Sequence, residues 1–248
     1  MKKTLILIAA AFVLSACNFN INDVKIGNGK LVVCGGEVVE RTMDLSGFNE
    51  VLLQGAAKVV YSQEDSFLVS VKANEEVFKY LDYEVKGEKL VITTKDGVNI
   101  KAKTYVVTLN APLLKDINVM GAADLEMKDG YSSSDPLKIV VSGAGDLDLA
   151  GIEVPSMSIL INGAGDLDID KANASEISVT VNGAGDLDLY NLYAESVNVT
   201  VRGAGDVQLS GKTNQADFHV SGAGTIDARA LKCENVTTAK NGAATIRL

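Results

Sequence analysis

The chain has 248 residues, a net charge of −9, a single histidine, no tryptophan and an aromatic content of 5%. An acidic chain is a poor partner for nucleic acid and for direct electrostatic docking on anionic lipid, because both carry negative charge. The few aromatic residues also argue against a sugar-binding surface built from stacked rings. After the N-terminal residues, no segment is apolar for long enough to span a bilayer.

The first seventeen residues have the pattern of an export signal. Lys2 and Lys3 precede an apolar stretch, Leu5–Leu14, that is too short to persist as a spanning anchor. The stretch ends in Leu-Ser-Ala-Cys, which resembles the lipobox of bacterial lipoproteins, where the cysteine receives acyl chains. We therefore predict a lipoprotein signal peptide at residues 1–16 and lipidation of Cys17. The alternative is an ordinary secretory signal followed by a chance cysteine.

Residues 17–36 are polar and contain glycine, which indicates a tether between the lipid and a folded body. Two further cysteines, Cys34 and Cys233, lie near opposite ends of an exported chain, where a disulfide is chemically permitted. A linear stack would hold them far apart. We therefore expect two separate thiols rather than a bridge.

Residues 37–112 contain many segments with a β-strand pattern but lack a clear repeated motif. We therefore expect an irregular N-terminal section of the same fold. Gly55-Ala56-Ala57 looks like a degraded copy of the motif found downstream, and residues 75–81 could form one or two helical turns. The expected strands are 51–53, 58–61, 67–71, 82–85, 90–93 and 105–109.

One heptad dominates the rest of the chain. The sequence Gly-Ala-Gly-Asp-Leu-Asp-Leu at residues 143–149 returns almost unchanged at residues 163–169 and 183–189. Weaker copies begin at Gly121, Gly203, Gly222 and Gly242. A fixed period of about 20 residues indicates one structural unit stacked on copies of itself.

Within each repeat, apolar and polar residues alternate, which predicts strands with one dry and one wet face. In residues 176–192 the two glycines fall on the inward parity, where a side chain would collide with the interior or with a tight bend. We predict an all-β fold, a parallel β-helix with about 20 residues per coil, covering residues 37–248 and regular over 113–248. The alternative is a sandwich of antiparallel hairpins.

Stacking in register would align the acidic residues of the repeat in two columns. The first column is Asp146, Asp166, Asp186 and Asp206, extended upstream by Asp124. The second column is Asp148, Asp168 and Asp188, extended by Glu126 and Asp227.

Carboxylates about 5 Å apart repel by roughly 1 kcal/mol even in water. Solvent, backbone N–H groups and raised pKa values can offset that repulsion. The alternative is bound Ca²⁺, which prefers oxygen ligands, although weak attraction of cations without a defined metal site is the expected outcome.

Other candidate residues are few. Ser142, Asn162, Asn182 and Ser221 precede the glycine corners and are expected to form a structural ladder along the axis. Tyr190 and Tyr193 share one loop between coils and form the best candidate contact patch. His219 lies alone on a strand and is expected to be an outward or partly buried polar residue. No serine or cysteine nucleophile motif accompanies it, so we expect no catalytic triad.

Residues 37–248 resemble the family called putative auto-transporter adhesin, head GIN domain. The resemblance rests on Phe48-Asn49-Glu50-Val51, Gly55, residues 59–63, Leu90-Val91-Ile92 and residues 106–113, followed by repeated Ser/Asn-Gly-Ala-Gly-Asp elements. It implies a right-handed β-helix in envelope lipoproteins of Gram-negative bacteria, and it supplies no catalytic residues. The last repeat, Gly242-Ala243-Ala244-Thr245, departs from the usual corner.

These observations predict a non-enzymatic, lipid-anchored protein of the cell envelope, at the outer membrane, that serves as a surface adhesion or ligand-binding module. Its expected partners are the membrane, through the lipid, and a surface glycan or protein, with no nucleic acid. Two alternatives are a carbohydrate-active enzyme on a β-helix scaffold and a structural envelope spacer. A groove holding two unlike carboxylates, or a basic residue beside them, would favour the enzyme.

Overall fold

The structure is a computed structural model that describes residues 25–26, 29–95 and 98–248. The predicted signal peptide and Cys17 lie outside these residues. Over the described part the fold is a β-solenoid of about seven turns, with parallel bridges about 20 residues apart, so the prediction of a parallel coil is confirmed. The handedness of the solenoid stays a prediction. The described residues contain no helix that is both long and apolar enough to cross a membrane.

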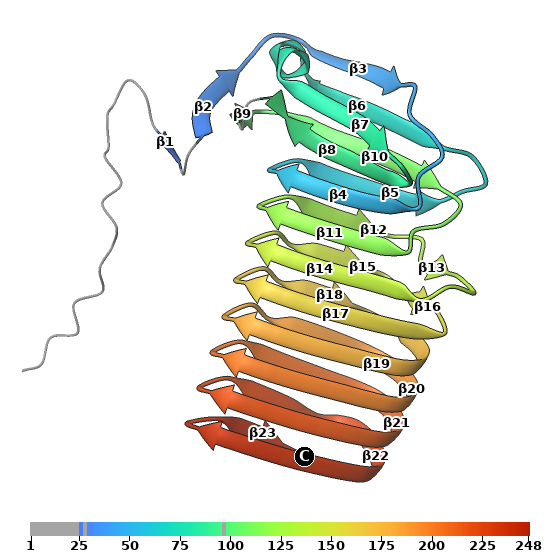
Figure 1. The fold of residues 1–248 in the computed structure, drawn as a ribbon, viewed down its shortest axis with the longest axis vertical. Helices are drawn as coiled ribbons and strands as arrows, with labels where there is room; N and C mark the ends of the chain where they lie inside the picture. The colour runs from blue at the N-terminus through green and yellow to red at the C-terminus, as the bar shows by residue number, and fades with distance from the viewer. Residues whose placement is uncertain (1–24, 27–28, 96–97) are drawn as a thin grey trace, which may run out of the picture.

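The regular coils stack as rungs of a ladder (Figure 1). On one long side, each strand pairs in parallel with the next, as in the series Val141, Ile161, Val181, Val201 and Val220. These long-side strands are β11 (Asp116–Gly121), β14 (Leu137–Gly143), β17 (Ser156–Gly163), β19 (Ala172–Gly183), β20 (Leu187–Gly203), β21 (Asp206–Gly222) and β22 (Thr225–Gly242). The sandwich of antiparallel hairpins is therefore excluded for these coils.

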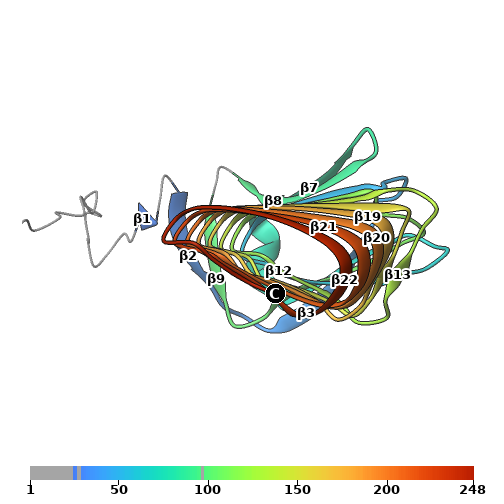
Figure 2. The same cartoon turned by 90° about the horizontal axis from the view of Figure 1, so that it is seen from below.

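After each corner the chain returns along the other long side, where the first residues of β20, β21 and β22 continue a second parallel ladder. Its shorter strands are β12 (Asp124–Met127), β15 (Leu147–Leu149), β18 (Leu167–Ile169) and β23 (Thr245–Arg247). Viewed along the axis, the coils superpose into a flattened loop with two long sides (Figure 2). Two short strands, β13 (Tyr131–Ser132) and β16 (Ile152–Glu153), lie on the connecting side.

Alternating side chains fill the interior of every coil. Along β17, Met157, Ile159 and Ile161 are buried, whereas Ser158 and Asn162 face out. The same parity continues through the corner into Leu167 and Ile169. Because each coil buries its apolar face against its neighbours, the core is continuous along the stack, and Phe218 is one of its largest fully buried residues near the C-terminal end.

The two corner glycines are required for different reasons. Gly183 has a φ of +138°, and a Cβ there would lie 2.2 Å from the carbonyl oxygen of Gly163 in the preceding coil. Gly185 has no positive φ, but its Cβ would lie 2.4 Å from the Gly165 oxygen and 2.8 Å from Ile161 Cγ2. The collision that excludes side chains is thus mainly with the backbone of the adjacent coil, and with the interior only at the second glycine.

The N-terminal section begins as a coil and ends as a mixed cap. Strand β4 (Glu50–Gly55) pairs in parallel with β11, and Gly55 aligns with Gly121, so Gly55-Ala56-Ala57 occupies the corner of the first coil. Above it, pairs become antiparallel, namely β3–β6, β6–β10 and β7–β8. The elements are β3 (Val38–Met43), β5 (Lys58–Gln63), β6 (Leu68–Asn74), the 3₁₀ helix η1 (Glu75–Lys79), β7 (Leu81–Lys86), β8 (Lys89–Thr94) and β10 (Tyr105–Ala111).

A small separate sheet is formed partly by residues 17–36, the range that we expected to be a tether. It contains β1 (Lys25–Ile26), β2 (Gly29–Cys34) and β9 (Asn99–Ala102), with β2 parallel to β9. Cys34 is buried and Cys233 is half-buried, and both are free thiols, so the expectation of two separate thiols is confirmed. Burial raises the pKa of the Cys34 thiol.

Candidate functional site

The register of the second ladder brings the acidic side chains of successive coils side by side. Asp168 aligns directly with Asp148 on one side and Asp188 on the other. Glu126 continues this column upstream, and Gln208, Asp227 and Arg247 continue it downstream. The acidic face is defined here as the outward residues Asp146, Asp148, Asp166, Asp168, Asp186, Asp188 and Asp206.

In the first column, carboxylates are stabilised by the backbone of the following coil. The N–H of Asp206 donates to Asp186 Oδ1 at 2.9 Å, and the N–H of Thr225 donates to Asp206 Oδ1 at 3.0 Å. A longer bond of 3.3 Å joins the N–H of Asp186 to Asp166 Oδ1. Each of these side chains therefore links two coils, because hydrogen bonds to a charged acceptor are stronger than neutral ones.

The two ends of the second column are neutralised by cations. Glu126 lies 3.1 Å from Lys58 Nζ and 2.9 Å from Lys128 Nζ, and hydrogen bonds from these lysines lower its pKa. At the other end, hydrogen bonds from Arg229 hold the pKa of Asp227 well below its usual range, and Arg247 adds a contact at 3.4 Å.

The middle of the second column has no such compensation. In the described part of the chain, none of the ion pairs involves Asp148, Asp168 or Asp188. Partial burial, followed by the charges of Asp188 and Asp148, raises the pKa of Asp168. Tyr190 donates its hydroxyl to Asp188 Oδ2 at 2.7 Å, and this bond, together with burial and the acidic surroundings, raises the pKa of Tyr190 to about 12.

The middle of the second column borders a shallow groove of about 340 Å³. The groove is lined by Glu126, Lys128, Asp148, Asp168, Asp170 and Tyr190. Residues 25–26, 29–95 and 98–248 contain no group of three or more histidine, cysteine, aspartate or glutamate side chains placed so that they could hold a metal ion. The arrangement can concentrate cations by charge alone, because the unpaired carboxylates lie in one line.

The two tyrosines of the candidate contact patch have different environments. Tyr190 is half-buried beside Asp188, in the acidic groove. Tyr193 is 62% exposed and follows a bulge at Asn191, which has a positive φ of 47°. Between them, Leu192 is buried in the core. Tyr193 is thus available for contact, whereas the hydroxyl of Tyr190 is already engaged.

The other long side carries uncharged polar groups that sequence reasoning largely missed. The neutral face is defined as the outward residues of β17, β19 and β20 that lie in register between the exposed, charged Glu176 and Arg202, namely the apolar Leu160 and the polar Ser158, Asn162, Ser178, Thr180, Asn182, Asn198 and Thr200. Asn182 Nδ2 donates to Asn162 Oδ1 at 2.9 Å, which is part of the expected ladder. The signal in the sequence is the run of Ser, Thr and Asn between the buried positions of each repeat.

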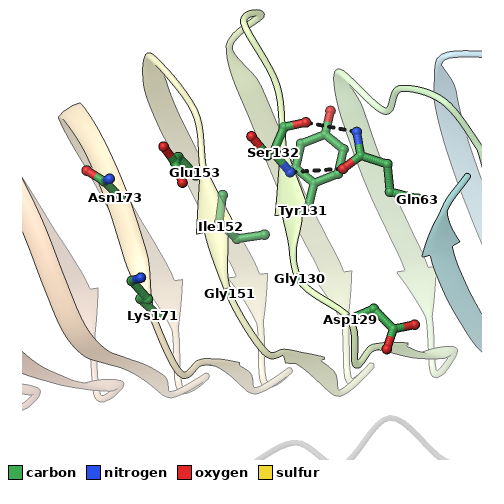
Figure 3. Close-up of a pocket in the computed structure, with 10 residues that line it drawn as sticks. All are labelled: Gln63, Asp129, Gly130, Tyr131, Ser132, Gly151, Ile152, Glu153, Lys171 and Asn173. Carbon is green, nitrogen blue, oxygen red and sulfur yellow. Dashed lines mark hydrogen bonds between the residues drawn. The ribbon is translucent and has the colours of Figure 1, made fainter.

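A second groove, of about 270 Å³, lies on the connecting side (Figure 3). Its upstream wall is fixed by Gln63, which donates to the Ser132 carbonyl at 2.8 Å and accepts from the Ser132 N–H at 3.0 Å. Glu153 lies on the next coil, and Lys171 and Asn173 lie together on the coil after it. The side chains of opposite charge and the glycines Gly130 and Gly151 give it a mixed, polar lining.

His219 lies on the surface of β21 and pairs locally. Its Nε2 is 2.9 Å from Asp217 Oδ1, and both side chains are about half exposed. This agrees with an outward polar position.

The family profile described as putative auto-transporter adhesin, head GIN domain, matches residues 47–209 and 158–248. Solved structures of similar fold include a putative adhesin from Bacteroides fragilis, with a TM-score of 0.78 and 19% identity over 87% of this chain and 99% of that one. A putative lipid binding protein and a putative adhesin from Parabacteroides distasonis have TM-scores of 0.71 and 0.72, each with 18% identity over 88% of this chain and 100% of theirs. No curated protein matches the sequence. Because the profile covers most of the solenoid, the chain belongs to the family of the putative auto-transporter adhesin, head GIN domain.

Proposed function

We propose that this protein is a non-enzymatic, lipid-anchored component of the outer membrane that acts as a surface adhesion or ligand-binding module. The family description supports the adhesive role. The order Leu14-Ser15-Ala16-Cys17 supports a lipid anchor on Cys17, and several acyl chains would hold the protein on a membrane without a spanning helix.

One observation carries the adhesive function, namely the neutral face. Its hydroxyl and amide groups recur in register on successive strands, which are spaced about 4.8 Å apart. A regular array of uncharged donors and acceptors can make many weak, equivalent hydrogen bonds to an extended partner. Such contacts gain strength by multivalency rather than by one deep pocket.

The enzymatic alternative depends on the acidic groove. Asp168 and Glu126 line it together, and their pKa values move in opposite directions, as an acid and a base would require. However, Glu126 Oε2 lies 3.1 Å from Lys58 Nζ and Oε1 lies 2.9 Å from Lys128 Nζ. Both oxygens of Glu126 are held in ion pairs that lower its pKa, which makes this carboxylate a weaker proton acceptor. This favours adhesion over glycoside hydrolysis.

The test is an array of glycans and host proteins probed with the full-length chain in detergent micelles, with and without calcium. We expect binding that Thr180→Asp reduces, because it places a charge in the neutral face. The matched control, Gln208→Asp, adds the same charge at an outward position of the other long side and should leave binding intact. A chain that binds nothing in either condition would favour the spacer, and released sugar would favour the enzyme.

The anchor is tested separately by labelling cells with a radioactive fatty acid. The wild-type protein should incorporate label and sediment with the outer membrane, whereas Cys17→Ala should do neither. Label on the Cys17→Ala protein would contradict lipidation at this residue.

A further inference from the structure

The neutral face changes character at its C-terminal end. Along its columns, Arg202 takes the place held by Asn162 and Asn182, and His219 takes the place held by Thr180 and Thr200. In the last long strand, Lys240 takes the position of Val220. Three successive coils thus depart from the repeat by gaining a basic residue.

The three departures meet in one place. Arg202, His219 and Lys240 line a cavity of about 480 Å³. Thr200, Ser221 and Asn241 line it as well, supplying two hydroxyl groups and an amide. Lys240 has an inward register, but no further coil covers it in the described structure, so its side chain is exposed at the open end of the stack. The cavity is larger than either groove described above.

The cations in this cavity are not neutralised by its lining. No aspartate or glutamate lines it, and the adjacent Asp217 contacts His219 at 2.9 Å. Among the described residues, the Arg202 guanidinium donates a long hydrogen bond of 3.5 Å to Asn182 Oδ1. A guanidinium offers five N–H donors in a planar fork that matches a carboxylate or sulfate, so most of its donors remain for a ligand.

We propose that this cavity binds an acidic glycan, with Arg202 and Lys240 holding a carboxylate or sulfate group of the sugar. Thr200, Ser221 and Asn241 then hydrogen-bond the sugar hydroxyls. A saccharide fits better than a nucleic acid, because the acidic face of the same coils repels a long, densely charged polyanion but not one sparsely charged unit at a local site. The inference names a ligand class and rests on the proposed function only for its biological role.

Binding is measured by titration calorimetry on the full-length chain in micelles. The probes are a disaccharide that carries a single uronate carboxylate, a disaccharide that carries a single sulfate group and a neutral disaccharide of the same size. We expect one or both of the acidic probes to bind at least tenfold more tightly than the neutral probe, and the two acidic arms distinguish carboxylate from sulfate recognition. Equal affinity for all three would overturn the proposal.

The variants restore the repeat or remove charge at solvent-exposed positions, so the fold is expected to survive. Arg202→Asn reproduces Asn182, and His219→Thr reproduces Thr200. We expect Arg202→Asn and Lys240→Gln each to weaken acidic-probe binding by about tenfold, because each removes a charged hydrogen-bond donor to the acidic group. The His219→Thr variant should weaken it less. Circular dichroism and the unfolding midpoint verify the fold of each variant.

The matched control is Lys212→Asn, which removes the same charge from an exposed position of β21 that does not line the cavity. It should leave affinity within about twofold of wild type. If it weakens binding as much as Arg202→Asn does, the effect is general electrostatics and the site is refuted. If the acidic probe binds but the array reveals no partner, the site is retained and the adhesive function is rejected. If an array partner binds wild type and Arg202→Asn equally well, and the acidic probes bind no more tightly than the neutral one, the adhesive function is retained and the site is rejected.

Discussion

The two long sides of the solenoid are formed by the same coils, yet they present opposite chemistry to the solvent. On β17, β19 and β20, the neutral face has no charged side chain between the register positions of Glu176 and Arg202, whereas the acidic face places carboxylates on consecutive rungs. Both sides have the same parallel register and the same buried alternation of apolar residues. The fold is therefore indifferent to surface charge within wide limits.

What the sides share is the corner that joins them. The N–H of Ala184 donates to the Gly163 oxygen at 2.8 Å, and the equivalent bond recurs at Ala144, Ala164, Ala204 and Ala223. This close backbone contact is available only where the preceding residue lacks a Cβ. The comparison thus assigns stability to the corner and the interior, and leaves the faces free for function.

The largest effect is expected at the corner. Gly183→Ala combines a strained positive φ with a Cβ 2.2 Å from the Gly163 oxygen, so we expect it to lower the free energy of unfolding by about 3–5 kcal/mol. Gly185→Ala should cost less, because its φ is not in the left-handed region. Chemical denaturation followed by circular dichroism measures both. The exposed Ala184→Ser is the neutral control, and a Gly183→Ala protein as stable as this control would refute the role of the corner.

A smaller effect separates hydrogen bonding from charge on the acidic face. Asp186 accepts the N–H of Asp206 at 2.9 Å. Asp186→Ala removes this acceptor, whereas Asp186→Asn keeps an oxygen and removes a charge from the column. We expect the alanine variant to be about 1–2 kcal/mol less stable than the asparagine variant at pH 7. Equal stabilities would mean that the bond contributes nothing beyond what water supplies.

The sequence was sufficient for the coils because period and parity are local properties. The inward positions of residues 157–169 and their copies could be assigned without knowing any long-range contact. The cap was not predictable in this way. Its antiparallel pairs, such as β3 with β6 and β6 with β10, join unlike segments whose paired residues are 26 to 42 positions apart, and no repeated motif indicates which segment pairs with which.

For the site, parity placed the acidic columns but not their partners. Whether Asp186 binds a backbone N–H depends on the side-chain rotamer and on the exact height of the next coil, neither of which alternation encodes. The basic cavity escaped prediction for another reason. Lys240 has an inward parity and reaches the outside only because no described coil covers it. The signal that could have indicated the cavity was the break in the repeat at Arg202, His219 and Lys240.

The neutral face allows a weaker test of the amide ladder. Asn182→Ala removes the donor to Asn162 Oδ1, and we expect a loss of about 0.5–1 kcal/mol in the free energy of unfolding. Asn182→Gln, which keeps the amide on a longer side chain, should recover part of that loss. If denaturation midpoints do not differ between wild type and Asn182→Ala, the ladder is a consequence of stacking and not a contributor to it.

The smallest effect concerns the middle of the second column, and its sign depends on pH. The pKa of Asp168 is raised above its ordinary value of 3.8, so folding disfavours its charged form. Its contribution is fully favourable below the unfolded pKa and is lost as pH rises through the folded one. Asp168→Asn should therefore stabilise the protein by a few tenths of a kcal/mol at pH 7, discounted for solvent screening, and by nothing at pH 3.

The matched control is Asp227→Asn, at the cation-paired end. Its pKa is lowered, so its contribution is present above the unfolded pKa and is lost as pH falls, and the variant should be less stable than wild type at pH 7. Opposite signs in unfolding experiments at pH 7 would show that one column of aligned carboxylates holds two electrostatic environments, whereas equal signs would mean that the cations at its ends are screened out.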